Sequence, residues 1–324
     1  MRLSFISLKK GSVAALLSIY MRILVTGGAG FIGSHTTEHL VRAGHDVAVL
    51  DDLSTGNAAN LEAVAGDIEL LEADIRDYQN LERACEGVDA VLHLAAISSV
   101  VKSLEEPLTA QAVNATGSLN VLEAARRRGA GRVILASSAA VYGDDPELPK
   151  AETSPVQPLS PYAWHKLTGE FYGKAWSRYY GIEFLALRYF NVYGPRQDPA
   201  SPYSGVLSIF LDRSAKGLPL TIFGDGEQTR DFIHVSDVAE VNRRALEAGG
   251  PLPDVINVAT GRETRIIDAA RVIQENSGSE AGVDFGPGRP GDIRRSCATG
   301  ELLAATFGYA PAVTVEEGLA GLSG

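Results

Sequence analysis

The stretch SPYAWHK, residues 160–166, places Tyr162 and Lys166 four residues apart, directly after a proline-rich run. On a helix, residues at positions i and i+4 lie one above the other on the same face. A lysine ammonium beside a tyrosine stabilises the phenolate, so the tyrosine hydroxyl ionises more easily. This pair is therefore a candidate for general-base catalysis. The alternative is a surface helix on which the two are neighbours by chance, because short motifs recur without function.

Short apolar segments alternate with helical patterns through the first part of the chain. The apolar segments are RILVT (22–26), DVAVL (46–50), IELLEA (68–73), AVLHLAA (90–96), RVILASS (132–138) and FLALRYF (184–190). Helical patterns occupy 31–43 and 107–128, and the second ends in basic residues before Gly129, which suits a helix C-terminus. Short, wholly apolar strands that alternate with helices indicate a parallel sheet covered on both faces. We therefore predict an α/β fold with a doubly wound parallel sheet.

After residue 190 the pattern becomes less regular and richer in glycine and proline, as in NVYGPRQDPASPYSG (191–205). This change indicates that the chain leaves the sheet and builds a second, smaller region. At the other end, residues 1–20 have basic residues and an apolar run that is too short to span a bilayer. Because no small-residue cleavage site follows, we predict a disordered extension or a misplaced start rather than a signal peptide.

Composition excludes several function classes. The chain of 324 residues has 29 Lys plus Arg against 40 Asp plus Glu, a net charge of −11, and such a surface repels nucleic acids. The two cysteines, Cys85 and Cys297, lie in no C-x-x-C motif and have no neighbouring histidine, so we expect reduced thiols with neither a disulfide nor a metal. No segment approaches membrane-spanning length, and we expect a soluble, cytoplasmic protein without a membrane partner.

A glycine-rich turn, TGGAGFIG (26–33), lies between the first strand and the first helix. In the spacing G-x-x-G-x-x-G, Gly27 permits the tight turn, Gly30 lets the backbone approach a pyrophosphate, and Gly33 allows helix and strand to pack closely. The pyrophosphate would lie at the helix N-terminus, beside Phe31 and Ile32, where the N–H groups and the helix dipole favour an anion. Glycines also serve ordinary tight turns, but here a strand precedes the motif and a helix follows it.

An acidic residue follows the glycine turn at the expected distance. Asp51 ends the second strand, 18 residues after Gly33, where its carboxylate can accept hydrogen bonds from a ribose 2′-hydroxyl. The same carboxylate would repel a 2′-phosphate, so NAD is predicted rather than NADP. The neighbouring Asp52, together with Asp74 and Ile75 in ADI (73–75), is expected to frame the adenine.

With these motifs in place, the chain resembles the extended short-chain dehydrogenases/reductases and, among them, the UDP-glucose / UDP-N-acetylglucosamine 4-epimerase family. The resemblance covers nearly all of residues 21–324 and rests on TGGAGFIG, LDDLSTG (50–56), HLAA (93–96), ASSAAVYG (136–143), YAWHK (162–166), RYFNVYGP (188–195) and RDFIHVSD (230–237). It implies a UDP-sugar substrate, a homodimer, and cofactor contacts from Leu94, Ala95 and Ala96. It also implies a Rossmann NAD-binding domain of residues 21–190 plus about 232–260, and a smaller α+β nucleotide-sugar-binding region of 191–231 plus about 261–324.

In proteins of this type the tyrosine and lysine act with a serine at the end of the fifth strand, which matches Ser138. The strand-end position agrees, because ligands of such folds bind beyond the carboxyl ends of the strands. Tyr162 would be the general base, Lys166 would lower its pKa and hold the nicotinamide ribose, and Ser138 would orient the sugar oxygen. By itself, a serine at this point serves equally well to cap a turn.

The residues after Ser138 bear on the reaction class. Dehydratases of this superfamily place an Asp–Glu pair or a Glu there, whereas this chain has Ala139 and Ala140, whose methyl groups are neither acids nor bases. Epimerisation through a 4-keto sugar is therefore predicted. Ala140 departs from some galactose-type epimerases, which have a threonine there. A nucleotide-sugar dehydratase or reductase, a UDP-glucuronate 4-epimerase and a non-catalytic NAD-sensing protein remain alternatives.

The resemblance assigns substrate contacts after the sheet. Asn191 matches a diphosphate contact, and Leu207 lies in the segment that covers the uracil. Arg230 and Arg289 would bind the diphosphate, since the guanidinium fork pairs with phosphate oxygens. Asp292 would accept a hydrogen bond from a ribose hydroxyl. Taken singly, such arginines are more often solvated surface charges, and it is the motif context that favours a diphosphate contact here.

A position seven residues after Arg289 faces the C2 substituent of the sugar in the family, and it is Ser296 here. A small residue leaves room for an acetamido group, and Ser98 and Ser99 match a serine-containing loop of the N-acetylhexosamine epimerases. Buried hydroxyls would satisfy the polar acetamido atoms, which are costly to bury unpaired. We therefore predict activity on UDP-N-acetylglucosamine and UDP-N-acetylgalactosamine beside UDP-glucose and UDP-galactose. The alternative is that Ser296 is small only for packing.

Overall fold

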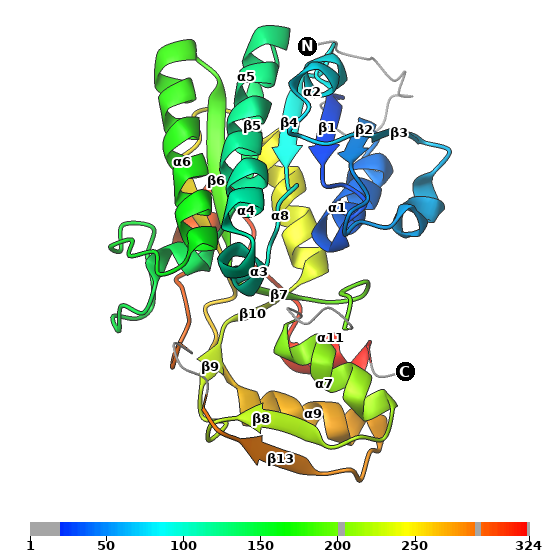
Figure 1. The fold of residues 1–324 in the computed structure, drawn as a ribbon, viewed down its shortest axis with the longest axis vertical. Helices are drawn as coiled ribbons and strands as arrows, with labels where there is room; N and C mark the ends of the chain where they lie inside the picture. Colours follow the sequence, from blue (N-terminus) through cyan, green and yellow to red (C-terminus); the bar gives the residue numbers. More distant parts are fainter. Residues whose placement is uncertain (1–19, 200–204, 289–292, 323–324) are drawn as a thin grey trace, which may run out of the picture.

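The computed structural model describes residues 20–199, 205–288 and 293–322. Its centre is a seven-stranded sheet in the order β11–β6–β5–β4–β1–β2–β3 (Figure 1). The strands are β1 (Arg22–Thr26), β2 (Asp46–Asp51), β3 (Ile68–Glu72), β4 (Ala90–His93), β5 (Arg132–Ser138), β6 (Glu183–Tyr189) and β11 (Val255–Val258). Every pairing between them is parallel, which confirms the predicted doubly wound α/β fold.

Helices cover both faces of this sheet because successive side chains of a strand point to opposite faces. Ile23 and Val25 pack into a core with α1 (Phe31–Arg42) and α8 (Val235–Glu247). Between them in the sequence, Leu24 packs into a second core on the opposite face. The helices over this second core are α2 (Tyr78–Ala84), α5 (Ser118–Arg128) and α6 (Pro161–Tyr180). Two buried faces explain why the strands are apolar throughout rather than alternating.

The predicted helical stretch 107–128 is continuous but not uniform. It consists of α4 (Pro107–Gln111), a π-helical turn (Ala112–Gly117) and α5, and Gly129 caps its end in the left-handed conformation. Before it lies a short helix, α3 (Val100–Glu105). Apolar periodicity does not distinguish a π-turn from an α-helical turn, so the insertion was not expected from the sequence.

A smaller region lies beyond the carboxyl ends of the central strands (Figure 1). Its strand pairs are β7 (Asn191–Tyr193) with β10 (Phe232–His234), β8 (Leu220–Phe223) with β13 (Val283–Gly286), and β9 (Thr229–Arg230) with β12 (Thr264–Arg265). A separate core joins α7 (Val206–Ala215), α9 (Ile266–Ser277) and α11 (Val315–Ala320) to these strands. Between α9 and α11, α10 (Glu301–Phe307) returns to pack against β11 and α8.

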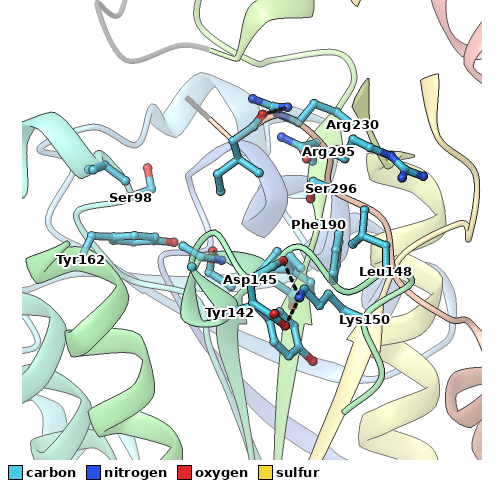
Figure 2. Close-up of a pocket in the computed structure, with 18 residues that line it drawn as sticks. Ser98, Tyr142, Asp145, Leu148, Lys150, Tyr162, Phe190, Arg230, Arg295 and Ser296 are labelled. Atoms are coloured by element: carbon cyan, nitrogen blue, oxygen red, sulfur yellow. Dashed lines mark hydrogen bonds and ion pairs between the residues drawn. The ribbon is translucent and has the colours of Figure 1, made fainter. Parts of the chain in front are cut away.

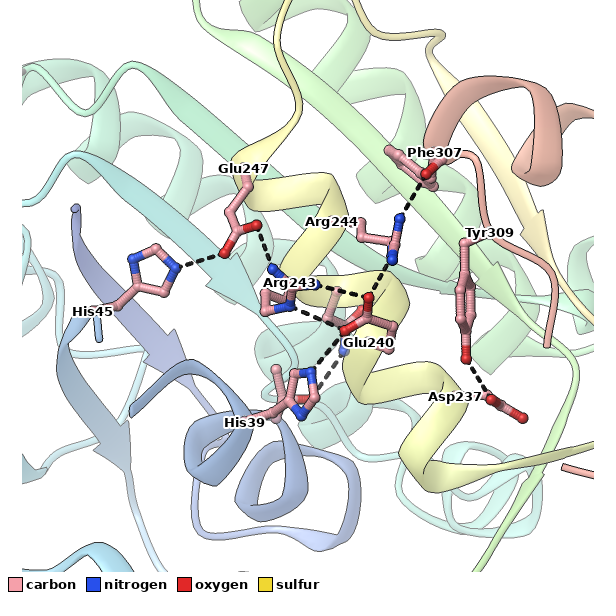
Figure 3. Close-up of polar contacts among 11 residues, drawn as sticks. His39, His45, Asp237, Glu240, Arg243, Arg244, Glu247, Phe307 and Tyr309 are labelled. Carbon is pink, nitrogen blue, oxygen red and sulfur yellow. Dashed lines mark hydrogen bonds and ion pairs between the residues drawn. The ribbon is translucent and has the colours of Figure 1, made fainter. Parts of the chain in front are cut away.

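A half-buried charge cluster joins α1 to α8 (Figure 3). The Glu240 carboxylate accepts hydrogen bonds from His39 Nε2 on α1 at 2.7 Å, from Arg243 Nη2 at 2.8 Å and from Arg244 Nε. Burial raises the pKa of Glu240, but the hydrogen bonds from Arg243, His39 and Arg244 outweigh it and lower this pKa to about 2. Glu240 therefore stays ionised and holds α8, which covers the sheet, against the helix that follows the glycine turn.

Three further sequence expectations concern the N-terminal extension, membrane-spanning helices and the two cysteines. Apart from Tyr20, the predicted N-terminal extension lies outside the described residues. Across the described parts of the chain, none of the helices combines the length and apolar character needed to cross a membrane. Cys85 and Cys297 are buried, free thiols.

Candidate functional site

The glycine turn lies at the carboxyl end of β1 and brings the backbone into close contact with itself and with the end of β4. Gly27 has φ +73°, and a Cβ on it would lie 2.6 Å from Ala95 N. A Cβ on Gly33 would lie 2.0 Å from Gly27 O, which leaves room only for glycine. The N-cap residue of α1 is Gly30, which has no side chain to cover the first turn. The turn thus has the open helix N-terminus that a pyrophosphate requires.

Asp51 ends β2 beside this turn and is 6% exposed. Its Oδ2 accepts a hydrogen bond from Ala29 N at 2.9 Å, and its Oδ1 accepts one from Leu53 N at 2.9 Å. Burial raises the pKa of Asp51, and the two backbone hydrogen bonds oppose this rise. A Cβ on Gly56 would lie 2.7 Å from Oδ1, so the carboxylate lies in a close-fitting cradle. Each oxygen has a second lone pair with which to accept a ribose hydroxyl.

Of the residues expected around the adenine, Asp52 and Asp74 bond neighbouring polar groups, whereas the side chain of Ile75 lies in the core. Asp52 Oδ1 accepts hydrogen bonds from Ser54 N and Ser54 Oγ at 3.0 and 2.6 Å. A hydrogen bond from Arg76 lowers the pKa of Asp74. Ile75 is buried in the core and contacts Gly117 rather than a cavity. Leu94, Ala95 and Ala96 follow β4, which ends at His93 rather than at residue 96.

Tyr162 and Lys166 occupy the first turns of α6, which begins at Pro161 with Ser160 as its N-cap. The Ser160 Oγ accepts a hydrogen bond from Ala163 N at 3.2 Å, which fixes the start of the helix. The Lys166 Nζ lies 5.8 Å from the centre of the Tyr162 ring and donates to Ala136 O of β5 at 2.8 Å. Both side chains are buried, so their charges are little screened by water.

Ser138 is the last residue of β5, and its Oγ accepts a hydrogen bond from Ala140 N at 3.2 Å. Burial raises the pKa of Tyr162, while a hydrogen bond with Ser138 lowers it. Burial also lowers the pKa of Lys166 to about 8. The arrangement places a hydroxyl, a phenol and an ammonium group of shifted pKa together at the carboxyl edge of the sheet, as acid–base chemistry requires.

A buried hydrogen-bonded chain supports the strand ends beneath these residues. Ser118 Oγ donates to Asn114 O at 2.6 Å, so it accepts from His93 Nε2 at 2.9 Å. His93 Nδ1 therefore accepts from Thr26 Oγ1 at 2.7 Å. Burial lowers the pKa of His93 to about 3, which keeps the ring neutral. Asn114, in the π-helical turn, bonds Ile97 N at 2.8 Å and Ile97 O at 2.9 Å, and so fixes the loop that leads to Ser98.

A cavity of about 260 Å³ opens above Ser138 and Tyr162. Figure 2 shows Ser98 and Tyr162 on one side of it, and Arg230, Arg295 and Ser296 on another. The predicted site residues that line it are Ser98, Ser138, Tyr162, Asn191, Arg230 and Ser296. A second, larger cavity of about 710 Å³ shares most of these and extends to Phe31, Ile32 and Leu207. These predicted substrate residues thus share one connected space with the predicted cofactor residues Phe31, Ile32 and Tyr162. The glycines of the turn, Asp51 and Lys166 line neither cavity.

The remaining predicted substrate residues do not all line the cavities, and Arg230, which does, bonds two backbone carbonyls. Ser99 caps α3 through a hydrogen bond from Lys102 N at 2.9 Å and is absent from the lining of both cavities. Arg230 Nη1 donates to Thr229 O at 2.8 Å and to Ile293 O at 2.6 Å. Arg289 and Asp292 lie outside the described residues.

Several lining residues were not expected from the sequence. Lys150, 4% exposed, donates to Asp145 O at 2.8 Å and pairs with the Asp145 carboxylate on the cavity wall (Figure 2). In the larger cavity, Gln228 Nε2 donates to Phe223 O at 2.8 Å, and Gln228 Oε1 has no partner among the described residues. This orientation of the amide is fixed, because a flip would place Gln228 Oε1 against the carbonyl oxygen of Phe223, and both are acceptors. The only sequence signal for Gln228 was its place two residues before Arg230.

Comparisons with known proteins agree with this geometry. The model of the NAD dependent epimerase/dehydratase family matches residues 23–259. The UDP-glucose 4-epimerase of Mycolicibacterium smegmatis is 39% identical over 306 residues, which cover 93% of this chain and 96% of that protein. The structure of UDP-N-acetylglucosamine 4-epimerase from Methanobrevibacter ruminantium M1, in complex with UDP-N-acetylmuramic acid, is 37% identical with a TM-score of 0.87, covering 92% and 97% of the two chains.

The structure of Thermus thermophilus UDP-glucose 4-epimerase in complex with NAD is 41% identical, with a TM-score of 0.84, and covers 93% of this chain and 97% of that chain. The residues matched by the family model include the glycine turn, β5 and α6. The chain therefore belongs to the NAD dependent epimerase/dehydratase family, and its cofactor is NAD.

Proposed function

We propose that this protein is a UDP-hexose 4-epimerase, which inverts C4 of the sugar through a transient 4-keto form. The observation that carries the proposal is the wall of the smaller cavity, where Ser138 and Tyr162 lie together with Ala139 and Ala140. The first two can remove and return the proton of a sugar hydroxyl. The two alanines offer no acid or base to assist the loss of water at the next carbon, as a dehydratase would need.

The chain's own residues have distinct tasks in this proposal. NAD, when bound, supplies the hydride acceptor and donor for the sugar carbon. Tyr162 takes the proton of the 4-hydroxyl and later returns it, while Ser138 holds the same oxygen. Lys166 favours the ionised tyrosine by its charge, and it retains N–H groups beyond the one donated to Ala136 O. Because Tyr162 and Lys166 are buried, their mutual interaction is stronger than it would be in water.

The same geometry supports the proposed cofactor and substrate contacts. We propose that Asp51 accepts hydrogen bonds from the adenosine ribose, and that the backbone of the glycine turn holds the pyrophosphate. Asn191, Arg230 and the apolar end of the larger cavity would bind the UDP part, with Leu207 beside the base. In this division, residues 21–190 and about 232–260 bind NAD, and 191–231 with about 261–324 bind the nucleotide sugar.

The activity is tested by incubating the full-length protein with UDP-galactose, UDP-N-acetylgalactosamine and UDP-glucuronate and separating the products by chromatography. We expect UDP-glucose and UDP-N-acetylglucosamine from the first two substrates, without added reductant. Product from UDP-glucuronate alone would favour the uronate epimerase instead. If no sugar is converted while NAD remains bound, the NAD-sensing alternative is favoured.

The sugar preference gives a specific prediction for Ser296. A tyrosine there would fill part of a cavity of about 260 Å³, so Ser296→Tyr should lower kcat/KM for UDP-N-acetylgalactosamine on the order of tenfold or more relative to UDP-galactose. Ser296→Ala, which adds no bulk, is the matched control and should leave the ratio of the two activities within about threefold. An unchanged ratio in the tyrosine variant would show that Ser296 does not limit the C2 substituent.

We further propose that the chain forms a homodimer through the outer face of α4 and α6. Leu108, Trp164 and Phe171 are 84%, 57% and 60% exposed, and large apolar side chains grouped on one face favour association. Light scattering after size exclusion should give twice the monomer mass for the wild type and the monomer mass for Phe171→Glu. Phe285→Glu changes an equally exposed residue, on β13, and should leave the dimer intact. A monomeric wild type would contradict the proposal.

A further inference from the structure

Asp231 is fully buried where three segments meet, two of which border the smaller cavity. Its Oδ1 accepts hydrogen bonds from Thr260 N at 2.8 Å and Thr260 Oγ1 at 2.7 Å. Its Oδ2 accepts from Gly261 N at 3.0 Å, from Ala298 N at 3.4 Å and, at 3.6 Å, from the Cys297 thiol. One carboxylate therefore joins residues that are 29 to 67 positions away in the sequence.

Residues next to these contacts face the cavity. Arg230 directly precedes Asp231, and Ser296 directly precedes Cys297; both line the cavity. The backbone of Asp231 contributes as well, because its carbonyl accepts a hydrogen bond from Asn191 N at 3.0 Å. Arg230 also donates to Ile293 O at 2.6 Å, which connects the same two walls a second time.

We propose that Asp231 is a positioning residue, whose carboxylate sets the placement of Arg230 relative to Ser296, and whose carbonyl holds Asn191 beside them, and that it thereby sets the affinity for the nucleotide sugar. Asp231 is not among the residues that line either cavity, so it acts through its neighbours rather than by touching substrate. The inference rests on the proposed function, because it assumes that these cavity residues bind a nucleotide diphosphate sugar.

The chemistry requires a carboxylate rather than an amide. All five groups that face Asp231 are donors, and a carboxylate has acceptor sites only. An asparagine would keep one oxygen for Thr260 but would set its NH₂ group against Gly261 N–H or Ala298 N–H. Burial and the nearby Asp231 charge raise the pKa of the Cys297 thiol to about 12, so this group stays protonated and remains a donor.

The experiment compares Asp231→Asn with wild type in the full-length, NAD-loaded protein. We expect KM for UDP-galactose to rise on the order of tenfold, because binding residues lose their placement, while kcat stays within about threefold, because Ser138, Tyr162 and Lys166 lie on other elements. Asp237→Asn is the matched control. Asp237 is 3% exposed and accepts from Tyr309 Oη, from Ala312 N at 3.2 Å and from Val313 N at 3.1 Å, away from both cavities.

The control should lower the melting temperature without a change in KM. If both variants lose stability and neither changes KM, Asp231 is only structural and the proposal is wrong. If Asp231→Asn does not fold, Thr260→Val removes one donor to Oδ1 and should raise KM by about threefold, whereas an unchanged KM contradicts the proposal. The dissociation constant of UDP, measured by calorimetry, should also rise in Asp231→Asn and Thr260→Val and stay unchanged in Asp237→Asn. This measurement tests Asp231 even if the wild type converts no UDP-sugar.

Discussion

Replacing Tyr162 by phenylalanine is expected to lower the turnover of a UDP-sugar by about 10²- to 10⁴-fold, the contribution that a positioned proton-transfer group typically makes. The substitution removes only the hydroxyl. Lys166 and Ala136 keep their hydrogen bond, and the first turn of α6 keeps its cap from Ser160. KM for the UDP-sugar and the amount of bound NAD should therefore change little.

The surroundings of Tyr162 also predict how turnover depends on pH. Burial raises the pKa of the phenol, and a hydrogen bond with Ser138 lowers it, so turnover should increase as rising pH ionises Tyr162. Burial lowers the pKa of Lys166 to about 8, so above this pH the ammonium that favours phenolate is lost. We expect turnover to rise with pH up to about 8, because the ionised fraction of Tyr162 grows as the pH approaches its raised pKa, and not to rise further where Lys166 loses its proton. The rising limb should be absent from the residual activity of Tyr162→Phe.

Single-turnover assays with UDP-galactose provide the measurement. Tyr142→Phe is the control, because this neighbouring tyrosine also lines the cavity, and its hydroxyl bonds Asn257 Oδ1 at 2.7 Å and Arg188 Nη1 at 2.9 Å. That variant should be less stable but should keep most of its turnover. If Tyr162→Phe retains more than about a tenth of wild-type turnover, Tyr162 is not the general base.

The parts of the fold that depend on nearby residues could be predicted from the sequence. β1, β5 and the start of α1 agree with the apolar runs and the glycine turn, because strand and turn preferences act within a few residues. The four-residue spacing of Tyr162 and Lys166 was readable for the same reason. β4 was predicted too long, since residues 94–96 are apolar but lie beyond the end of the strand at His93.

The parts that depend on distant partners could not be predicted. Asp231 gains its role from Thr260 and Ala298, and no local pattern indicates that these segments meet. The orientation of Gln228 depends on the carbonyl of Phe223, at the end of another strand. The side chain of Ile75, which was expected to frame the adenine, packs in the core against Gly117. Motif position shows that a residue is near a site, whereas the side-chain direction follows from packing.

Arg188 and Glu170 form a buried ion pair between β6 and α6, and breaking it is expected to destabilise the protein strongly. Arg188 of β6 and Glu170 of α6 are 3% and 1% exposed. Arg188 donates through Nε to Oε1 at 2.9 Å and through Nη2 to Oε2 at 2.7 Å, and Ser137 Oγ donates to Oε1 at 2.5 Å. The pair thus holds α6, which carries Tyr162, against the strands that end at the cavity.

Arg188→Met should lower the free energy of unfolding by about 3–5 kcal/mol, because Glu170 would remain as a buried charge without its partner. Removing both charges should cost less, since apolar side chains of similar size often replace a buried pair with little loss. We therefore expect the double variant Glu170→Leu/Arg188→Met to be more stable than Arg188→Met alone in urea denaturation. Lys174 is also on α6 and pairs with the exposed Asp254 at 3.9 Å, so Lys174→Met should cost less than about 1 kcal/mol.

The double variant also separates stability from function. Ser137 precedes Ser138, and Glu170 is the acceptor that fixes the Ser137 hydroxyl, so loss of Glu170 loosens the end of β5 next to the proposed proton-transfer groups. If the pair only stabilises the fold, the double variant should recover turnover together with stability. Recovered stability with turnover still reduced would show that the charged network also places Ser138. A double variant no more stable than Arg188→Met would contradict the unpaired-charge explanation itself.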